Sequence, residues 1–323
     1  MDSIAIAPRE LDILGNTKET AMFFKKIANE NRRKIKMDLQ NTTNIPTETR
    51  MYIGNLKYQT ERGQALGEVA YIPPSNATLS NRLETCRFLN GEDMSFELPS
   101  SEDEPSLKFG QCGYECDEEA ITKACGIAQN FLNPSNPKYL SELLRKIIFS
   151  LMANTKEHAK GTNDERDVAW SLYVKVDPDK ECVRFVFLDS GVGIPENIRG
   201  LKKSYIDINP KSYILKELME IVTRDEIFRF LEIDLKEDFE HIFTVIGQDY
   251  IRHDESGRGE GLKTLDRLYR EKRISSLRII SGNGDCDFEQ AENPGNKISD
   301  NKSGSFGGTL FYWEIYKDGV LNE

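Results

Sequence analysis

The sequence predicts an α/β protein with a small N-terminal unit and a larger C-terminal unit. Helix-like and strand-like segments alternate in the first hundred residues. Apolar residues recur at intervals of three and four over residues 140–151, which is typical of an amphipathic helix that continues to about residue 159. Two strand-like runs, 168–176 and 182–189, flank the turn sequence D-P-D-K and predict a hairpin. We therefore expect a mixed or antiparallel sheet covered by helices on one face.

The N-terminal unit, residues 1–98, is expected to be a small α/β module. Its helices show apolar residues at helical spacing, and its strands are short alternating runs. The predicted elements are helices at 17–33 and from about Thr47, and strands at 35–39 and 66–72. The helix, strand and helix around I-K-M-D-L resemble a STAS-type module. The alternative interpretation is a layer for dimerisation or partner docking.

Residues 99–136 are expected to form an acidic linker or loop, because turn-forming and acidic residues gather between residues 97 and 119. Cys112, Cys116 and Cys125 lie in this segment. The spacing of the first two is compatible with the start of a zinc site, but no second pair of ligands follows. Ordinary thiols are the favoured interpretation.

The composition fits a soluble protein without a nucleic-acid partner. The net charge is −11 and the pI about 5.1, whereas a general phosphate-binding surface needs an excess of Lys and Arg. No apolar run is long enough to span a bilayer, and the first residues lack a signal-peptide pattern. We expect a cytoplasmic protein with no membrane contact and with its six cysteines reduced.

Three glycine-bearing segments of the C-terminal unit, residues 137–323, suit a ligand that carries phosphate. They are F-L-D-S-G-V-G-I-P at the end of a strand, S-G-R-G-E-G-L before a helix at 261–270, and F-G-G-T-L-F at the start of a strand at 308–316. Glycine lets a backbone approach phosphate closely, and a helix N-terminus offers unpaired N–H groups. A carboxylate at a strand end accepts a hydrogen bond from an amine such as that of adenine. Taken singly, each segment is equally compatible with an ordinary turn.

With the helix segment L-M-A-N-T-K-E-H-A in front, these segments resemble the N, G1, G2 and final boxes of the GHKL ATPases, the superfamily of gyrase B, Hsp90, histidine-kinase catalytic domains and MutL. The resemblance covers about residues 140–316. It implies a Bergerat fold, an α/β sandwich that holds ATP and Mg²⁺ between sheet, helices and a mobile lid. Residues 195–256 are long for that lid, so we expect a helical insertion there. No histidine precedes the helix segment, so a phospho-accepting histidine domain of the usual arrangement is not expected.

The resemblance also implies a role for individual residues. Asn154 is expected to bind Mg²⁺ through its carbonyl oxygen, a ligand type that this hard cation prefers. Asp189 is expected to read adenine with Thr309 beside it, and Arg258 to meet the phosphates. The expected nucleotide-binding residues are Asn154, His158, Asp189, Gly191, Gly193, Ile194, Gly257, Arg258, Gly259, Gly261, Leu262 and Thr309.

One position departs from the family pattern. Gyrase-type and Hsp90-type members carry a water-activating Glu four residues before the Mg²⁺-binding Asn, and Ser150 occupies that position here. A serine hydroxyl is a poor general base at neutral pH. Glu142 and Glu157 are the nearby alternatives.

Three functions are therefore weighed, all with ATP as ligand and with a protein partner or a second copy of the chain. The first is a nucleotide-dependent conformational switch with slow ATP hydrolysis. The second is a serine/threonine kinase of the anti-sigma-factor type. The third is a non-catalytic ATP-binding scaffold. The intact glycine segments favour ATP binding, and the ATPase reading is preferred over the kinase.

Overall fold

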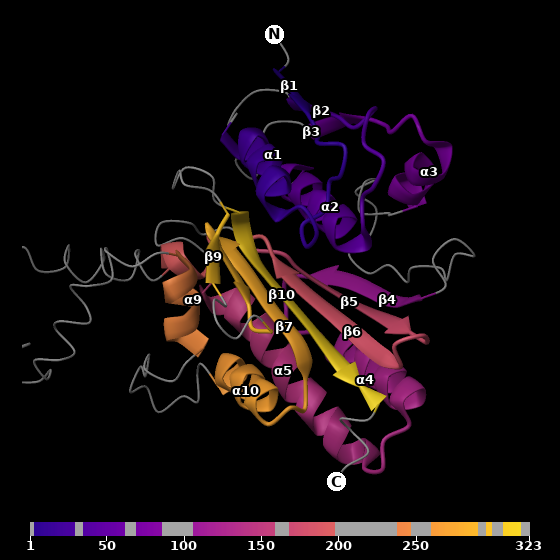
Figure 1. Cartoon of the computed structure of the whole chain (residues 1–323), viewed down its shortest axis with the longest axis vertical. Helices are drawn as coiled ribbons and strands as arrows, with labels where there is room; N and C mark the ends of the chain where they lie inside the picture. Colours follow the sequence, from indigo (N-terminus) through magenta and orange to yellow (C-terminus); the bar gives the residue numbers. More distant parts are fainter. Residues whose placement is uncertain are drawn as a thin grey trace, which may run out of the picture.

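Two sheets organise the fold (Figure 1). The computed structural model describes residues 3–29, 35–61, 69–85, 106–158, 168–197, 238–246, 260–289, 295–298 and 306–317. Within them, three strands form a parallel sheet, the small sheet, and seven form an antiparallel sheet, the large sheet. The predicted α/β class is confirmed, and the C-terminal sheet is antiparallel.

The small sheet belongs to the N-terminal unit, in which strands and helices alternate. Its elements are β1 (Ser3–Ile6), α1 (Thr17–Asn29), β2 (Ile35–Asp38), α2 (Thr47–Glu61), β3 (Val69–Ile72) and α3 (Ala77–Thr85). The strands lie in the order β1-β2-β3 and are parallel. Both helix predictions and both strand predictions for this unit are confirmed within the described residues. Figure 1 shows α1 and α2 between the small sheet and the large sheet.

The large sheet has the strand order β4-β5-β6-β10-β7-β8-β9. Its strands are β4 (Leu107–Gly113), β5 (Trp170–Asp177), β6 (Cys182–Asp189), β7 (Ser275–Gly282), β8 (Gly284–Asp287), β9 (Gly295–Lys297) and β10 (Phe306–Tyr316). The predicted hairpin is the pair β5 and β6. The last strand, β10, inserts between β6 and β7, so the two halves of the C-terminal unit form one sheet.

Four of the described helices cover one face of the large sheet, and the larger hydrophobic core lies between them and the sheet. They are α4 (Glu118–Leu132), α5 (Pro137–His158), α9 (Asp238–Ile246) and α10 (Glu260–Arg270). Apolar residues of all four pack against inward-facing residues of the strands, among them Phe185, Phe187 and Trp313. The rings of Phe185 and Trp313 are stacked, with centroids 5.1 Å apart.

The opposite face of the large sheet is covered by the N-terminal unit, which differs from the expectation of helices on one face only. Val186, Leu188 and Leu310 share a buried cluster with residues of α1 and α2, such as Phe24 and Tyr52. The physical reason is visible in C-V-R-F-V-F-L-D, where β6 is apolar on both faces. Strands buried on both faces read as nearly continuous apolar runs.

The segment 99–136 differs from the expected linker or loop from Leu107 onward. Residues 107–113 form β4, the edge strand paired with β5, and α4 contributes Ala120, Ile121 and Ala124 to the larger core. Asp117 caps α4 by accepting hydrogen bonds from the N–H groups of Glu119 and Ala120. The acidic residues of D-E-E are therefore the cap and first turn of a helix, where negative charge is favourable.

The described helices include none that is both long and apolar enough to cross a membrane.

Candidate functional site

The candidate site centres on Asp189, the last residue of the central strand β6. Its backbone lies opposite Trp170 of β5 and Thr309 of β10. The residue is 7% exposed, and its Oδ1 accepts a hydrogen bond from the Gly191 N–H at 2.9 Å. Both the hydroxyl and the backbone of Thr309 also hydrogen-bond to this carboxylate. Asp189 and Thr309, which are 120 residues apart, thus form one polar group because β10 pairs with β6.

Burial raises the pKa of Asp189 to about 6, although hydrogen bonds from Gly191 and Thr309 oppose the rise. The carboxyl is therefore mainly ionised at neutral pH. It is a buried acceptor with two oxygens, of which Oδ1 is engaged by Gly191.

Gly308 brings the start of β10 close to the end of β6. Its φ is +98°, and a Cβ placed there would lie 2.0 Å from the Asp189 carbonyl oxygen. No side chain fits that space, and the left-handed backbone further disfavours other residues. The glycine of G-G-T thus permits the contact that sets Thr309 beside Asp189.

Ser281, near the end of β7, joins two of the glycine segments and was missed by the sequence analysis. Its Oγ accepts from the Ile194 N–H at 2.9 Å and donates to the Gly308 carbonyl at 3.0 Å. It also lies 3.0 Å from the Thr309 Oγ1. Gly193, with φ +83°, allows the approach, because a Cβ there would meet the Ser281 Oγ at 2.8 Å. The available signal was a polar residue that ends the apolar run L-R-I-I before Gly282.

The start of α9 contacts the turn between β7 and β8. Asp238 is 9% exposed, and its Oδ2 accepts from the Asn283 N–H at 2.6 Å. α9 lies within the expected lid, residues 195–256, and carries His241. Apart from residues 195–197 and α9, the expected lid lies outside the described residues.

α5 carries Asn154, which is half-buried one turn before the end of the helix. Lys156 of α5 pairs with Glu115, and the Glu115 carbonyl accepts from the Trp170 indole N–H at 2.9 Å. Trp170 lies opposite Asp189 in the sheet. The helix segment predicted to bind Mg²⁺ is therefore connected, through Trp170, to the strand end that carries the carboxylate.

The remaining predicted residues are described only in part. Gly261 and Leu262 lie in the first turn of α10 and His158 is the last residue of α5, but the positions of their side chains are outside the described part. Gly257, Arg258 and Gly259 lie outside the described residues altogether. The structure thus groups Asp189, Gly191, Gly193, Ile194 and Thr309 into one cluster.

No protein-family model and no curated protein matches this sequence.

The N-terminal unit contacts this cluster through Tyr52 of α2. Its hydroxyl donates to the Gly307 carbonyl at 3.0 Å, next to Gly308. Burial raises the pKa of Tyr52, and the nearby charge of Asp189 raises it further, so the phenol remains a donor. A movement of the Gly307 carbonyl at the start of β10 would therefore alter a hydrogen bond of α2.

No described residues form a group of three or more His, Cys, Asp or Glu side chains that could hold a metal ion. Cys116 is half-buried and Cys125 is buried, and the Cys125 Sγ donates to the Ser141 carbonyl at 3.7 Å. Burial raises the pKa of the Cys125 thiol. Because zinc binds the thiolate, this environment disfavours Cys125 as a ligand.

Proposed function

We propose that the chain binds ATP and Mg²⁺ in a Bergerat-type site of the GHKL class and acts as a nucleotide-dependent conformational switch. The observation that carries the proposal is the cluster around Asp189. Three sequence segments meet there, with a buried carboxylate at a central strand end and glycines at positions that tolerate no side chain. An ordinary turn explains one such glycine, but it does not explain why separate segments converge on one buried carboxylate.

Asp189 is suited to recognise adenine. An ionised carboxylate accepts hydrogen bonds only, and the exocyclic amine of adenine is a donor. A carboxylate has about four lone-pair sites, so the hydrogen bonds from Gly191 and Thr309 leave acceptor capacity for the base. Guanine presents a carbonyl at the equivalent position of its ring, so the same carboxylate would repel it.

Asn154 is the proposed Mg²⁺ ligand, with the nucleotide phosphates and water completing the coordination. Arg258 and the glycines at positions 257, 259 and 261 are proposed to meet the phosphates at the start of α10. Gly261 belongs to the first turn of that helix, where N–H groups and the helix dipole favour an anion.

The switch is proposed to act through β10 and α2. ATP would contact Thr309, and the same strand carries, two residues earlier, the Gly307 carbonyl that accepts from Tyr52. A ligand shifts a conformational equilibrium only by its differential affinity for the two states. The Tyr52 contact gives the N-terminal unit a direct dependence on the state of the nucleotide site.

Hydrolysis is proposed to be slow, because Ser150 stands in place of the base. Of the two alternatives, Glu142 has a described side chain, whereas the side chain of Glu157 lies outside the described part. Glu142 lies twelve residues before Asn154 on α5, or about 18 Å along the helix. Its exposed carboxylate is paired with Lys138 instead. Glu142 is therefore too far away to activate water beside a metal at Asn154.

The test measures the thermal stability of the full chain with ATP, ADP and Mg²⁺, together with phosphate release. A bound nucleotide stabilises the folded state by mass action. We expect a shift with ATP and Mg²⁺ in wild type that Asp189→Asn abolishes. Asp179→Asn is the matched control, because it removes the same charge from the exposed turn between β5 and β6. Slow phosphate release supports the switch, whereas transfer of phosphate to a co-expressed protein would replace it with the kinase. Absence of any shift would contradict the proposal.

A further inference from the structure

The small sheet has one covered face and one open face. Figure 1 shows α1 and α2 on the side that faces the large sheet. Ala5 and Met37 point to this side, where they are buried with residues of both helices, such as Phe24 and Tyr52. Successive residues of a strand point to opposite faces, so the sequence neighbours of Ala5 and Met37 point outward. Parallel sheets are usually covered on both faces, and the open face is therefore a candidate interaction surface.

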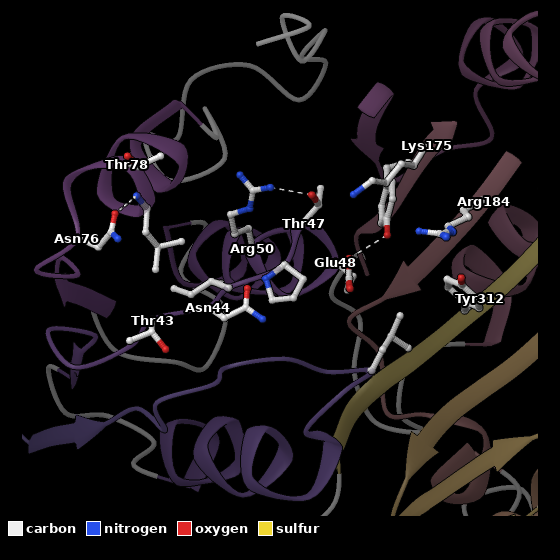
Figure 2. A pocket seen from close by; sticks show the side chains of 15 residues that line it. Thr43, Asn44, Thr47, Glu48, Arg50, Asn76, Thr78, Lys175, Arg184 and Tyr312 are labelled. Carbon is white, nitrogen blue, oxygen red and sulfur yellow. Dashed lines mark hydrogen bonds between the residues drawn. The ribbon is translucent and has the colours of Figure 1, made fainter. Parts of the chain in front are cut away.

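The N-terminal unit is already joined to the large sheet on its covered side. The Tyr173 hydroxyl of β5 donates to the Glu48 carboxyl of α2 at 2.9 Å, beside a cavity of about 440 Å³ (Figure 2). Tyr52 adds the hydrogen bond to the Gly307 carbonyl. The described residues that line the cavity include none of the outward-facing residues of the small sheet. The contacts with the large sheet thus leave the open face available to a partner.

The outward-facing residues of the three strands form a surface that we call the outer patch. They are Ile4, Ile6, Lys36, Asp38, Ala70 and Ile72. Ile4 and Ile6 are 51% and 66% exposed and lie side by side on β1, an edge strand of the small sheet. Single exposed apolar residues are common, whereas adjacent ones mark interaction surfaces. Ala70 and Ile72 lie on β3, so the charged residues of β2 have apolar neighbours on both sides.

The central strand of the outer patch carries one positive and one negative charge. Lys36 and Asp38 point outward two residues apart on β2. Lys36 is exposed and makes no ion pair within the described ranges of the chain. Asp38 is half-buried and accepts a hydrogen bond from the Gln40 N–H at 3.1 Å. The order of the two charges along β2 determines which surface complements the outer patch.

A second copy of the chain complements this order of charges when its strands run antiparallel to those of the first. A two-fold axis between the two outer patches, perpendicular to the strands and level with Met37, places Lys36 of each copy opposite Asp38 of the other. Ile4 of each copy then lies opposite Ile6 of the other, because Ile4 is level with Lys36. An axis parallel to β2 would instead place Lys36 against Lys36 and Asp38 against Asp38. Attraction between opposite charges therefore selects the antiparallel arrangement.

We propose that the outer patch forms the contact of a homodimer, in which two small sheets pack face to face with antiparallel strands. Three strands of four residues each present a face of about 13 Å by 14 Å. Such a face buries less than the roughly 800 Å² per partner of a standard interface, so the dimer is weak, with a dissociation constant of about 10 µM to 1 mM. The contact involves no residue of the Asp189 cluster, and it does not depend on nucleotide binding.

The test is sedimentation equilibrium of the full chain across that range of concentrations, in which we expect wild type to pass from monomer to dimer. Lys36→Glu and Asp38→Lys should each weaken the dimer about tenfold or more, because each substitution creates two like-charge contacts across the axis. An equimolar mixture of the two variants should dimerise like wild type, because the mixed dimer has opposite charges at both contacts. The proposal is overturned if the mixture dimerises no more strongly than either variant alone.

Three further variants locate the contact. Ile6→Ser should weaken the dimer about tenfold or more, because both copies lose a buried isoleucine. Met22→Ser is its matched control, because Met22 lies on α1, outside the outer patch, and is as exposed as Ile4. Lys180→Glu reverses a charge in the exposed turn after β5 and, like Met22→Ser, should dimerise as wild type does.

Two results would overturn the proposal. One is an equal loss of dimer in Met22→Ser and Ile6→Ser, which would place the contact outside the outer patch. The other is a wild type that stays monomeric up to about 1 mM. If Ile6→Ser then melts at a lower temperature than wild type, another segment of the same chain covers the outer patch.

Discussion

The buried carboxyl of Asp189 should make the stability of the nucleotide-free protein depend on pH in a defined way. Its pKa is about 6 in the folded protein, compared with an ordinary value of 3.8. The folded state therefore holds the proton more tightly than the unfolded state. The resulting stabilisation is complete below about pH 3.8 and is lost as the pH rises through about 6. This difference in pKa corresponds to about 3 kcal/mol of unfolding free energy over the whole range.

The assay is urea unfolding of wild type and Asp189→Asn between pH 4 and pH 7. Fluorescence reports it, because the two tryptophans, Trp170 and Trp313, are fully buried in the larger core. Contributions of other titrating groups cancel when the variant is subtracted from wild type. The unfolding free energy of wild type relative to the variant should fall by about 2–3 kcal/mol from pH 4 to pH 7. A difference in unfolding free energy between wild type and Asp189→Asn that does not change with pH would refute the argument that burial raises the pKa of this carboxyl.

Three substitutions test the packing around the site. Ser281→Ala should lower the unfolding free energy by about 1–3 kcal/mol, because the Ile194 N–H and the Gly308 carbonyl lose a buried partner; urea unfolding measures it, and a loss below about 0.5 kcal/mol would contradict the contact. Gly308→Ala should abolish folding or lower the unfolding free energy by more than about 4 kcal/mol. Gly126→Ala, in α4, should raise the unfolding free energy by about 0.5–1 kcal/mol, because no atom lies within 4 Å of the new Cβ. Thermal melting followed by circular dichroism measures both variants. Equal changes in the two melting midpoints would refute the close contact at Gly308. Tyr52→Phe should lower the unfolding free energy by about 1–2 kcal/mol, because the Gly307 carbonyl loses its hydrogen-bond donor. An unchanged melting midpoint would show that this hydrogen bond does not stabilise the packing of α2 against β10.

The sequence was most informative where apolar periodicity was strong. The helix that carries Asn154, the hairpin β5–β6 and the strand that carries Thr309 all lie where their patterns predicted them. The proximity of Asp189 and Thr309 was predicted from a family resemblance and not from the apolar patterns, because strand order depends on residues far apart in the chain. β10 inserts between β6 and β7, and no local signal in its sequence specifies those neighbours.

The features that the sequence did not reveal depend on partners distant in the chain. The acidic segment 99–136 read as a linker because Asp117 and its neighbours favour turns, and the same residues also cap a helix. Ser281 became part of the site only through the register between β7 and β10. Likewise, the cover over the second face of the large sheet was missed because α1 and α2 were treated as a separate module. The apolar character of β6 on both faces was the available clue.

The most direct measurement of the central claim is equilibrium binding of ATP and GTP, each with Mg²⁺, to wild type and to Asp189→Asn. Asparagine offers one acceptor oxygen instead of two, and the Gly191 N–H competes for it. We predict that wild type binds ATP and rejects GTP, and that Asp189→Asn loses at least about tenfold in ATP affinity while Asp179→Asn binds like wild type. Equal binding of ATP and GTP by wild type, or undiminished ATP binding by Asp189→Asn, would contradict the account of Asp189 as the residue that reads adenine.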